Sequence, residues 1–482
     1  MRAAAVPRLE LGVGVSYRPE LHDFLEAHPD RIDVIEVEPQ TLCLPSNTPD
    51  GSFRALRSAL DRIVALPQPK LVHSVGIPVG GSRMSDPRHV PLLNEFIGAL
   101  DAPWCSEHLS FNTAVDASGP FFTGFFLPPR QSAGGLRAAV DAVRMVSSHL
   151  DVPLAIETGV NYLRPRDDEM GDGEFVAAVA ERAGCGILLD LHNVWSNARN
   201  GRQQVASYLR ALPKERVWEL HLAGGHEFRG FWIDAHSGAI PREVLALAED
   251  VVPELPNLRA IIFELDAAHL DALGAAGLLR QLDVMTKLWA RRGTRGAGGR
   301  PLGAGRPRTT RSGPSAASWE NTLGALAIGR RAAGPLAEEL SSDPALPILR
   351  TLVNEARAGM IVSALRFTVR LLLFHLGEPA VREMMQAYWR TAPPRQFACD
   401  EGIGFARHLM TVDAVADVPH ASELLAFELA VLRSSIGDET ATIRFRADPA
   451  ELFTALEAGW LPPPPGDRTY PFACRSDQRP FV

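Results

Sequence analysis

The stretch GILLDLHNVWSN, residues 186–197, joins an apolar run to a group of polar side chains. Its run of isoleucine and leucine is typical of a parallel strand that is buried on both faces. Asp190, His192 and Asn193 follow within four residues. If the chain stays extended, Asp190 and His192 lie on one face, and a turn then brings Asn193 round. We therefore expect a strand whose carboxyl end carries chemically active side chains.

The same pattern of a short apolar run occurs eight times in the first 290 or so residues. The predicted strands are Leu11–Ser16, Ile32–Glu38, Lys70–Val75, Trp104–Ser110, Pro153–Glu157, Gly186–Leu191, Arg216–Leu222 and Arg259–Asp266. The intervening segments have helical spacing: Leu21–Ala27, Phe53–Ala65, Val90–Leu100, Leu136–Leu150, Glu174–Ala183, Val205–Leu212, Arg242–Val251 and Leu270–Arg291. This alternation predicts an α/β fold with a parallel sheet. Eight units favour a closed TIM (β/α)8 barrel over an open sheet. Gly12-Val13-Gly14 lies inside the first strand, so it does not indicate a dinucleotide-binding turn.

Composition divides the chain into three parts, which we expect to be a barrel domain (1–290), a linker (291–318) and a second domain (319–482). The linker is mainly Arg, Gly, Pro, Ser and Ala with no acid. It is either a solvated flexible tether or a basic strip that touches a substrate or nucleic acid. The second domain is predicted to be smaller and mainly helical, of α+β type. Its one predicted strand is Thr440–Arg446, and Pro462–Pro465 is expected to be extended. We find no catalytic constellation in it and interpret it as a binding module.

Charge and cysteine content narrow the function classes. The net charge of −8 gives no support to a nucleic-acid-binding surface. The five cysteines are scattered without a CxxC pair, which argues against a disulfide framework and for a reducing cytoplasm. We see no signal-peptide core and no uncharged apolar run of membrane-spanning length. The expected class is a cytoplasmic enzyme that binds neither nucleic acid nor membrane.

Metal-binding side chains occur at or just past most of the predicted strand ends. Parallel strands of a barrel end at one mouth, so these side chains should converge there. The candidate metal ligands are His73, His108, Glu157, Asp190, Asn193, His221, Asp234, His236 and Glu264. Each alone could be an ordinary buried polar group, but their shared placement indicates a multi-metal site. Imidazole, carboxylate and amide ligands suit iron, manganese or zinc, and both hydrolytic and redox chemistry stay open. Gly224 and Gly225 should allow close backbone approach after the seventh strand.

These stretches resemble a known family. LGVGVSYRPEL, HSVGIPVGG, SEHLSFN, LAIETGVNY, LLDLHNVWSNARN, HLAGGHE with DAHSG, and IIFELD are together similar to the multinuclear non-heme iron-dependent oxidative enzymes, which include the methanobactin biosynthesis oxidase. The resemblance covers about residues 10–290. It implies a TIM barrel with two or three irons in mixed Fe(II)/Fe(III) states and dioxygen as co-substrate. It also implies oxidation of a ribosomally synthesised precursor peptide, often at cysteine.

The resemblance also implies a ligand set. His73, His108 and Glu157 would bind one iron, and Glu157, Asn193, His221 and Glu264 a second. Asp190, Asp234 and His236 would bind a third. We assign catalytic roles to Glu157, Asp190 and His192. The chain departs from the family pattern at Pro39-Gln40-Thr41, at Thr158 and at His192, which leaves the peptide register and the product open.

Family members commonly act with a separate partner protein that recognises the leader of the peptide. By this resemblance, the second domain here would be such a partner fused in cis, since residues 450–464 (AELFTALEAGWLPPP) are similar to such partners. The expected function is iron- and dioxygen-dependent oxidation of a precursor peptide. One alternative is a divalent-metal-dependent isomerase or endonuclease of the xylose-isomerase-like class. Another is a non-catalytic, metal-stabilised scaffold.

Overall fold

Eight parallel strands close into a barrel, in the order β1-β14-β11-β10-β9-β6-β5-β2 with β2 paired back to β1. The computed structural model describes residues 7, 9–46, 52–84, 86–294, 313–437 and 441–474. The barrel strands are β1 (Gly12–Ser16), β2 (Val34–Val37), β5 (Lys70–Ser74), β6 (Cys105–His108), β9 (Leu154–Glu157), β10 (Gly186–Asp190), β11 (Val217–Ala223) and β14 (Ala260–Glu264). Each falls on one of the eight predicted strands, so the predicted TIM barrel is confirmed.

Helices surround the barrel because the strands are apolar on both faces and must be covered. They are α1 (His22–Ala27), α2 (Arg57–Ala65), α3 (His89–Leu100), α4 (Ala133–Ser147), α5 (Asp172–Ala183), α6 (Leu191–Arg199), α7 (Val205–Ala211), α8 (Arg242–Val251) and α9 (Leu270–Trp289). Two expectations are wrong. The predicted helix over 53–65 starts as strand β4 (Phe53–Ala55). The chain is also not extended through His192, because the Asp190 side chain accepts a hydrogen bond from Asn193 N at 2.8 Å and caps α6.

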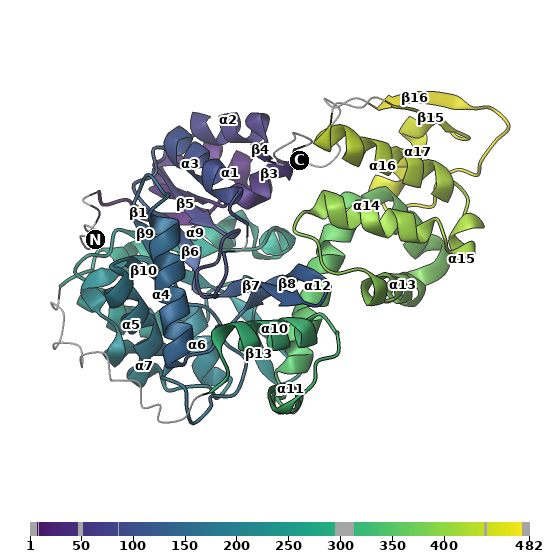
Figure 1. Ribbon diagram of the computed structural model, residues 1–482. Helices are drawn as coiled ribbons and strands as arrows, with labels where there is room; N and C mark the ends of the chain where they lie inside the picture. Colours follow the sequence, from purple (N-terminus) through teal and green to yellow (C-terminus); the bar gives the residue numbers. More distant parts are fainter. Residues whose placement is uncertain are drawn as a thin grey trace.

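Three hairpins decorate the barrel, and the strand pattern did not predict them. They are β3–β4 (Cys43–Pro45 and Phe53–Ala55), β7–β8 (Phe111–Asp116 and Gly119–Leu127) and β12–β13 (Gly225–Phe228 and Phe231–Asp234). The β7–β8 hairpin follows β6 directly and extends from the barrel toward the helices of the C-terminal region, residues 313–474 (Figure 1). It therefore connects the mouth of the barrel with the second part of the molecule.

The C-terminal region, which makes up about a third of the chain, is mainly helical with one small sheet, as expected. Its elements are α10 (Ala316–Ala327), α11 (Pro335–Ser341), α12 (Leu346–Ala364), α13 (Arg366–Thr391), α14 (Ala398–Leu409), α15 (Asp413–Ala416), α16 (Ala421–Ile436), β15 (Ala441–Phe445), α17 (Pro449–Glu457) and β16 (Tyr470–Cys474). α13 carries a break at Gly377, which has a φ of 79°. β15 lies within the predicted strand and pairs with β16; Thr440 is outside the described residues. Most of the predicted linker, residues 295–312, also lies outside them.

The barrel and the C-terminal region share a hydrophobic core. One buried cluster contains Phe111, Leu127 and Tyr162 of the barrel part together with Trp319 and Leu323 of α10. The Trp319 indole N–H donates to the carbonyl of Pro128 at 3.0 Å, and the guanidinium groups of Arg130 and Arg166 lie over its ring. The C-terminal region is thus packed through α10 on the segment that follows β8.

Two further observations concern the cysteines and the long helices. All five cysteines are free and buried. Within the described ranges, no single helix is long and apolar enough to cross a membrane. Only α12 and α13 taken together reach that length and composition, and they are bent by 105° relative to each other.

Candidate metal centre

The structure brings the nine predicted ligands together at the carboxyl end of the barrel. His108, Glu157, Asp190 and Glu264 are each the last residue of a barrel strand, and His73 and His221 lie near the ends of theirs. Asn193 lies in the first turn of α6, and Asp234 ends β13 with His236 two residues later. Residues that are far apart in sequence therefore meet at one mouth, as the barrel geometry requires.

The first cluster is formed by His73, His108 and Glu157. The Nε2 atoms of His73 and His108 lie 3.5 Å and 3.0 Å from Glu157 Oε2. His73 Nδ1 is hydrogen-bonded to Ser106 Oγ at 2.8 Å, so its Nε2 is left to face the cluster. The ring of Phe126 stacks on His108 with centroids 4.1 Å apart. Two oriented imidazoles and one carboxylate oxygen thus point at a common position, which is a metal-binding geometry.

The second cluster is centred on His221 and contains Glu36, which we did not predict. His221 Nδ1 lies 3.2 Å from Glu264 Oε2, and its Nε2 lies 3.0 Å from Glu36 Oε2. Glu36 is fully buried, and its other oxygen accepts from Ser16 Oγ at 3.0 Å. Because a carboxylate already occupies Nε2, the Nδ1 atom is the one directed toward Glu264 and a metal. Glu36 therefore orients His221 and does not itself need to be a ligand.

A sequence signal for Glu36 did exist. It is an acid in the middle of the apolar strand Val34–Val37, where burial without compensation is costly. Burial raises its pKa to about 8, against the opposing effect of His221. The rule that places ligands at or beyond strand ends does not cover Glu36, because Glu36 lies inside its strand.

The third group joins Asp234 with two histidines. Asp234 Oδ1 lies 3.3 Å from His236 Nε2 and 3.1 Å from His192 Nδ1. His236 Nε2 also lies 3.5 Å from Glu264 Oε2, which links this group to the second cluster. The Trp232 indole N–H donates to His192 Nε2 at 2.9 Å. Both ring nitrogens of His192 are therefore engaged, and this arrangement favours a role in positioning Asp234 over the predicted direct role in catalysis.

Two glycines make this arrangement possible. A side chain at Gly225 would come within 2.3 Å of the Ile233 carbonyl and 2.7 Å of the Trp232 indole nitrogen. One at Gly224 would come within 2.1 Å of the Ser237 carbonyl. The expected close backbone approach after the seventh strand is therefore confirmed.

Asp190 and Asn193 complete the set from the start of α6. One Asp190 oxygen caps the helix, while its Oδ2 has no hydrogen-bond partner among the described residues. Asn193 donates through Nδ2 to the Thr158 carbonyl at 3.2 Å, which leaves its Oδ1 for another partner. Thr158 Oγ1 accepts from Asp190 N at 2.8 Å. Thr158, one of the departures from the family pattern, thus holds the end of β10 in place.

The donor set fits bound metal ions. Within the described part of the chain, two buried oxygen atoms of this site, Asp190 Oδ2 and Asn193 Oδ1, have no hydrogen-bond partner. Four further buried atoms contact only other candidate ligands or His192: Glu157 Oε2, His221 Nδ1, Asp234 Oδ1 and Glu264 Oε2. Such atoms cost free energy when they are left unpaired in the interior. Burial and the charges of Asp234 and Glu264 raise the pKa of Asp190 well above its usual value. Cations among these carboxylates would remove both penalties.

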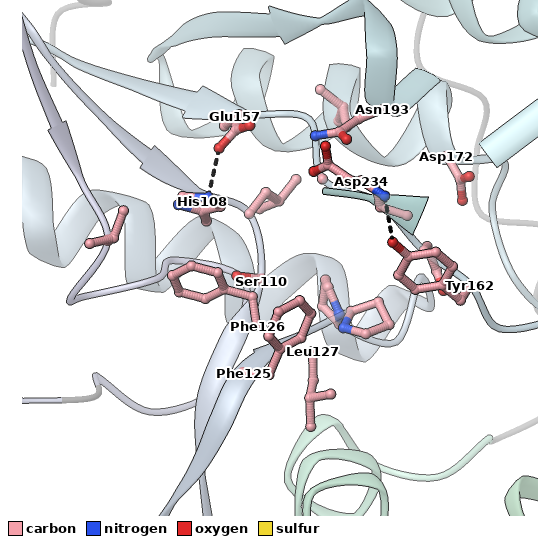
Figure 2. Close-up of a pocket in the computed structure, with 18 of the residues that line it drawn as sticks. His108, Ser110, Phe125, Phe126, Leu127, Glu157, Tyr162, Asp172, Asn193 and Asp234 are labelled. Atoms are coloured by element: carbon pink, nitrogen blue, oxygen red, sulfur yellow. Dashed lines mark hydrogen bonds and ion pairs between the residues drawn. The ribbon is translucent and has the colours of Figure 1, made fainter. Parts of the chain in front are cut away.

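Seven of the nine candidate ligands line a cavity of about 380 Å³, and Asp190 and His221 lie outside its lining. In Figure 2, Glu157, Asn193 and Asp234 lie on one side of this cavity, and Phe125, Phe126 and Leu127 of β8 lie on the other. Arg18 also lines it, and its Nη1 atom lies 2.8 Å from Glu38 Oε1. The cavity thus sets a polar metal face against an apolar wall that belongs to the hairpin, so an apolar group of a substrate can pack opposite the metals.

Known proteins resemble the chain to different extents. In overall structure, the chain is similar to D-allulose 3-epimerase from Methylomonas sp., with 14% identity, coverage of 60% of this chain and 97% of that one, and a TM-score of 0.38. In sequence, a UPF0276 protein of Streptomyces avermitilis is 32% identical over 244 residues, which make up 50% of this chain and 48% of that protein. The match therefore spans about half the length of this relative. A UPF0276 protein of Anaeromyxobacter sp. is 28% identical over 259 residues, 54% of this chain and 87% of that protein.

A family model covers the barrel. It describes the "RiPP precursor modification enzyme MbnB/TglH/ChrH" and matches residues 12–279, which include all eight barrel strands and every predicted ligand. RiPP stands for a ribosomally synthesised and post-translationally modified peptide. More than half of the chain is matched, so the protein belongs to the MbnB/TglH/ChrH family of RiPP precursor modification enzymes.

Proposed function

We propose that the protein is an iron- and dioxygen-dependent oxidase that modifies a ribosomally synthesised precursor peptide, with cysteine as the expected target. The observation that carries the proposal is the convergence of buried imidazole, carboxylate and amide side chains at one end of the barrel, where most of them line one cavity. Membership of the family supports a peptide substrate. The choice of iron follows from the resemblance and from the mixed nitrogen and oxygen donor set.

The residues of the chain have distinct tasks in this proposal. His73, His108 and Glu157 would hold one metal, and His221 with Glu264 would hold a second, with Glu36 orienting His221. Asp190, Asn193, Asp234 and His236 supply further oxygen and nitrogen donors beside these two groups. Bound iron would supply the activation of dioxygen and the oxidation of the substrate.

The apolar wall would position the peptide and exclude water. Phe125, Phe126 and Leu127 lie opposite the carboxylates, and Phe126 also stacks on His108. A cysteine or another apolar side chain would pack against this wall, which keeps water from competing for the site. Arg18 at the cavity is held by Glu38, so it is oriented toward the same space.

The C-terminal region would recognise the leader of the precursor peptide. Its mainly helical architecture and the two-stranded β15–β16 sheet are consistent with a peptide-binding module, because an extended peptide can add to the edge of a sheet. Fusion to the barrel would make capture of the leader and the chemistry intramolecular, which raises the effective concentration of the core peptide at the metals. No separate partner protein would then be required.

Metal content per chain tests the proposal. The protein is purified without oxygen from iron-supplied cells and measured by elemental analysis. More than one iron per chain, lost in Glu264→Gln and His221→Gln but retained in Glu38→Gln, is the expected result. Glu38 is a suitable control because it lines the cavity but is paired with Arg18. A protein that binds no metal in any form would refute the proposal.

The isomerase or endonuclease alternative makes a different prediction. It expects zinc, manganese or magnesium in place of iron, and activity that does not depend on dioxygen. The epimerase-like overall structure does not favour it, because the similarity has a TM-score of 0.38 and 14% identity. Zinc or manganese alone, even when iron is supplied, would therefore shift the assignment toward hydrolysis or isomerisation.

A further inference from the structure

A second hollow lies away from the metal centre, where α10, α12 and the end of α13 meet. Its volume is about 430 Å³, and its polar lining includes Arg330, Arg350, Arg390, Asn354 and Gln386. Trp389, Pro393 and Pro394 contribute apolar surface. We call this hollow the arginine pocket. Among the described residues that line it, none is acidic, which is unusual in a chain of net charge −8.

Only some of the arginines of the pocket are bonded to other groups within the described part of the protein. Arg330 forms an ion pair with Asp116 in the turn region of the β7–β8 hairpin. Arg350 donates through Nε to the Leu326 carbonyl at 2.7 Å, which helps to close the end of α10. Arg390 is exposed and has no hydrogen bond or ion pair within the described part of the chain. One guanidinium and part of another therefore stay available for an anionic ligand.

The backbone around the pocket distinguishes a peptide from a phosphate. Phosphate groups bind where helices begin, because the free N–H groups point outward there. Here both bordering helices end: α10 at Ala327 and α13 at Thr391. Carbonyl groups at helix C-terminal ends accept hydrogen bonds and repel anions. At α10 the Leu326 carbonyl already accepts from Gly329 N and Arg350 Nε, whereas at the end of α13 the following Pro393 and Pro394 have no N–H to donate, so carbonyls of the described residues stay free there. Arginines beside free carbonyls suit a chain with both acidic side chains and backbone N–H groups.

The pocket is also adjacent to the wall of the metal cavity. Pro394 borders the pocket and packs against Gly124 of β8, where an added Cβ would lie 2.9 Å from the proline ring. The next residues along β8 are Phe125, Phe126 and Leu127, which line the metal cavity. A peptide held in the arginine pocket would thus lie beside the part of β8 that continues directly into the wall of the metal cavity.

We propose that the arginine pocket binds an acidic segment of the precursor peptide, with glutamate or aspartate carboxylates on Arg390 and Arg350 and the peptide backbone on the helix-end carbonyls. This inference rests on the proposed function only in that a peptide is the substrate. It adds a recognition site that lies outside the metal centre and outside the β15–β16 sheet.

A binding experiment on the full-length protein tests the inference without turnover. The probe is a five-residue peptide with two glutamates, blocked at both ends and carrying an uncharged fluorescent dye. Its affinity is measured by fluorescence anisotropy at low salt. Arg390→Gln should weaken binding by about fivefold, the upper range for a partly exposed ion pair. A control peptide with glutamines in place of the glutamates should bind the wild-type protein no more tightly than the glutamate peptide binds Arg390→Gln.

Two controls give the result its meaning. Arg407→Gln removes the same charge from an exposed arginine in α14, outside the pocket, and should leave binding unchanged. Inorganic phosphate should displace the peptide no better than sodium chloride of equal ionic strength. Equal loss in both arginine variants, no loss in Arg390→Gln, or specific displacement by phosphate would each overturn the inference. Because the assay uses neither dioxygen nor catalysis, its failure is distinguishable from failure of the iron assignment.

Discussion

Single side chains decide how the metal centre is organised. Most of the ligands could be predicted because they lie where a buried barrel strand ends, and a barrel places those ends together. Asp234 and His236 come from the β12–β13 hairpin and the segment after it, and their Asp-x-His spacing was the signal that marked them. Glu36 could not be found by the same rule, since it lies inside its strand and acts through His221. The role of His192 also depended on a contact invisible in sequence, the indole N–H of Trp232, which follows it by forty residues in the chain.

Glu36→Gln is expected to weaken metal binding without abolishing it. Removal of an outer carboxylate that orients a metal-binding histidine typically costs about 10–100-fold in affinity. Excess metal should then restore full occupancy, whereas Glu264→Gln should lack one metal even at saturation. Metal titration of the apo-proteins measures both. Glu36 would have to be reassigned as a ligand if its variant behaved like Glu264→Gln.

Trp232→Phe tests the link from the indole to Asp234. Without the N–H donor, the His192 ring loses the hydrogen bond that keeps its Nδ1 directed at Asp234. Affinity for the metal nearest Asp234 should fall by about tenfold. Trp195→Phe is the matched control, because Trp195 packs edge-on against Trp232 with centroids 5.0 Å apart. Equal affinities in the two variants would contradict the positioning role.

At the scale of elements, the sequence predicted those that follow a simple period and missed those that do not. The barrel strands are short, mainly apolar runs, and seven of the eight predicted barrel helices agree within about three residues with α1, α3, α4, α5, α7, α8 and α9. The β7–β8 hairpin was missed because its strand Gly119–Leu127 mixes aromatic residues on both faces. Its consecutive residues Phe125, Phe126 and Leu127 all line the metal cavity, and the strand also packs on α10 and α12, so no apolar–polar alternation marks it as a strand.

Gly324→Ala in α10 should destabilise the protein, although alanine favours helices. An added Cβ would lie 2.7 Å from the Cβ of Ala114 in β7, so the helix would have to move off the hairpin. We expect a loss of about 1–2 kcal/mol in unfolding free energy. Gly359→Ala in α12 has open space around it and should stabilise by about 0.5–1 kcal/mol. Chemical denaturation of both variants measures the contrast, and matching signs would exclude this close packing.

At the scale of the molecule, a titratable side chain lies between the barrel and the C-terminal region. His89 of α3 is fully buried, its ring lies 4.4 Å from that of Phe53, and Phe53 contacts Phe397 at 5.0 Å. Its Nε2 atom also contacts the Gln396 amide. Burial lowers the pKa of His89 to about 4. The neutral ring is therefore the form that fits this contact.

Acid should loosen this contact. The pKa is lower in the folded state than in the unfolded chain, so the stabilisation is complete above about pH 6.5 and is lost as pH falls toward 4. The loss from this group amounts to about 3 kcal/mol at pH 4. His89→Gln removes the titration, so its melting temperature should fall less than that of the wild type between pH 7 and 4. Parallel curves for the two proteins would show that His89 does not carry this effect.

The core shared by Phe111, Leu127 and Tyr162 with Trp319 and Leu323 has a consequence for anyone who would re-engineer this protein. The barrel should not be stable when it is produced alone. A chain truncated near residue 294 would leave that apolar face of the hairpin exposed to solvent and prone to aggregation. A foreign recognition module also cannot simply be spliced on. A working chimera must import the hairpin together with the helices that seat on it, and with it one wall of the chamber where the chemistry takes place.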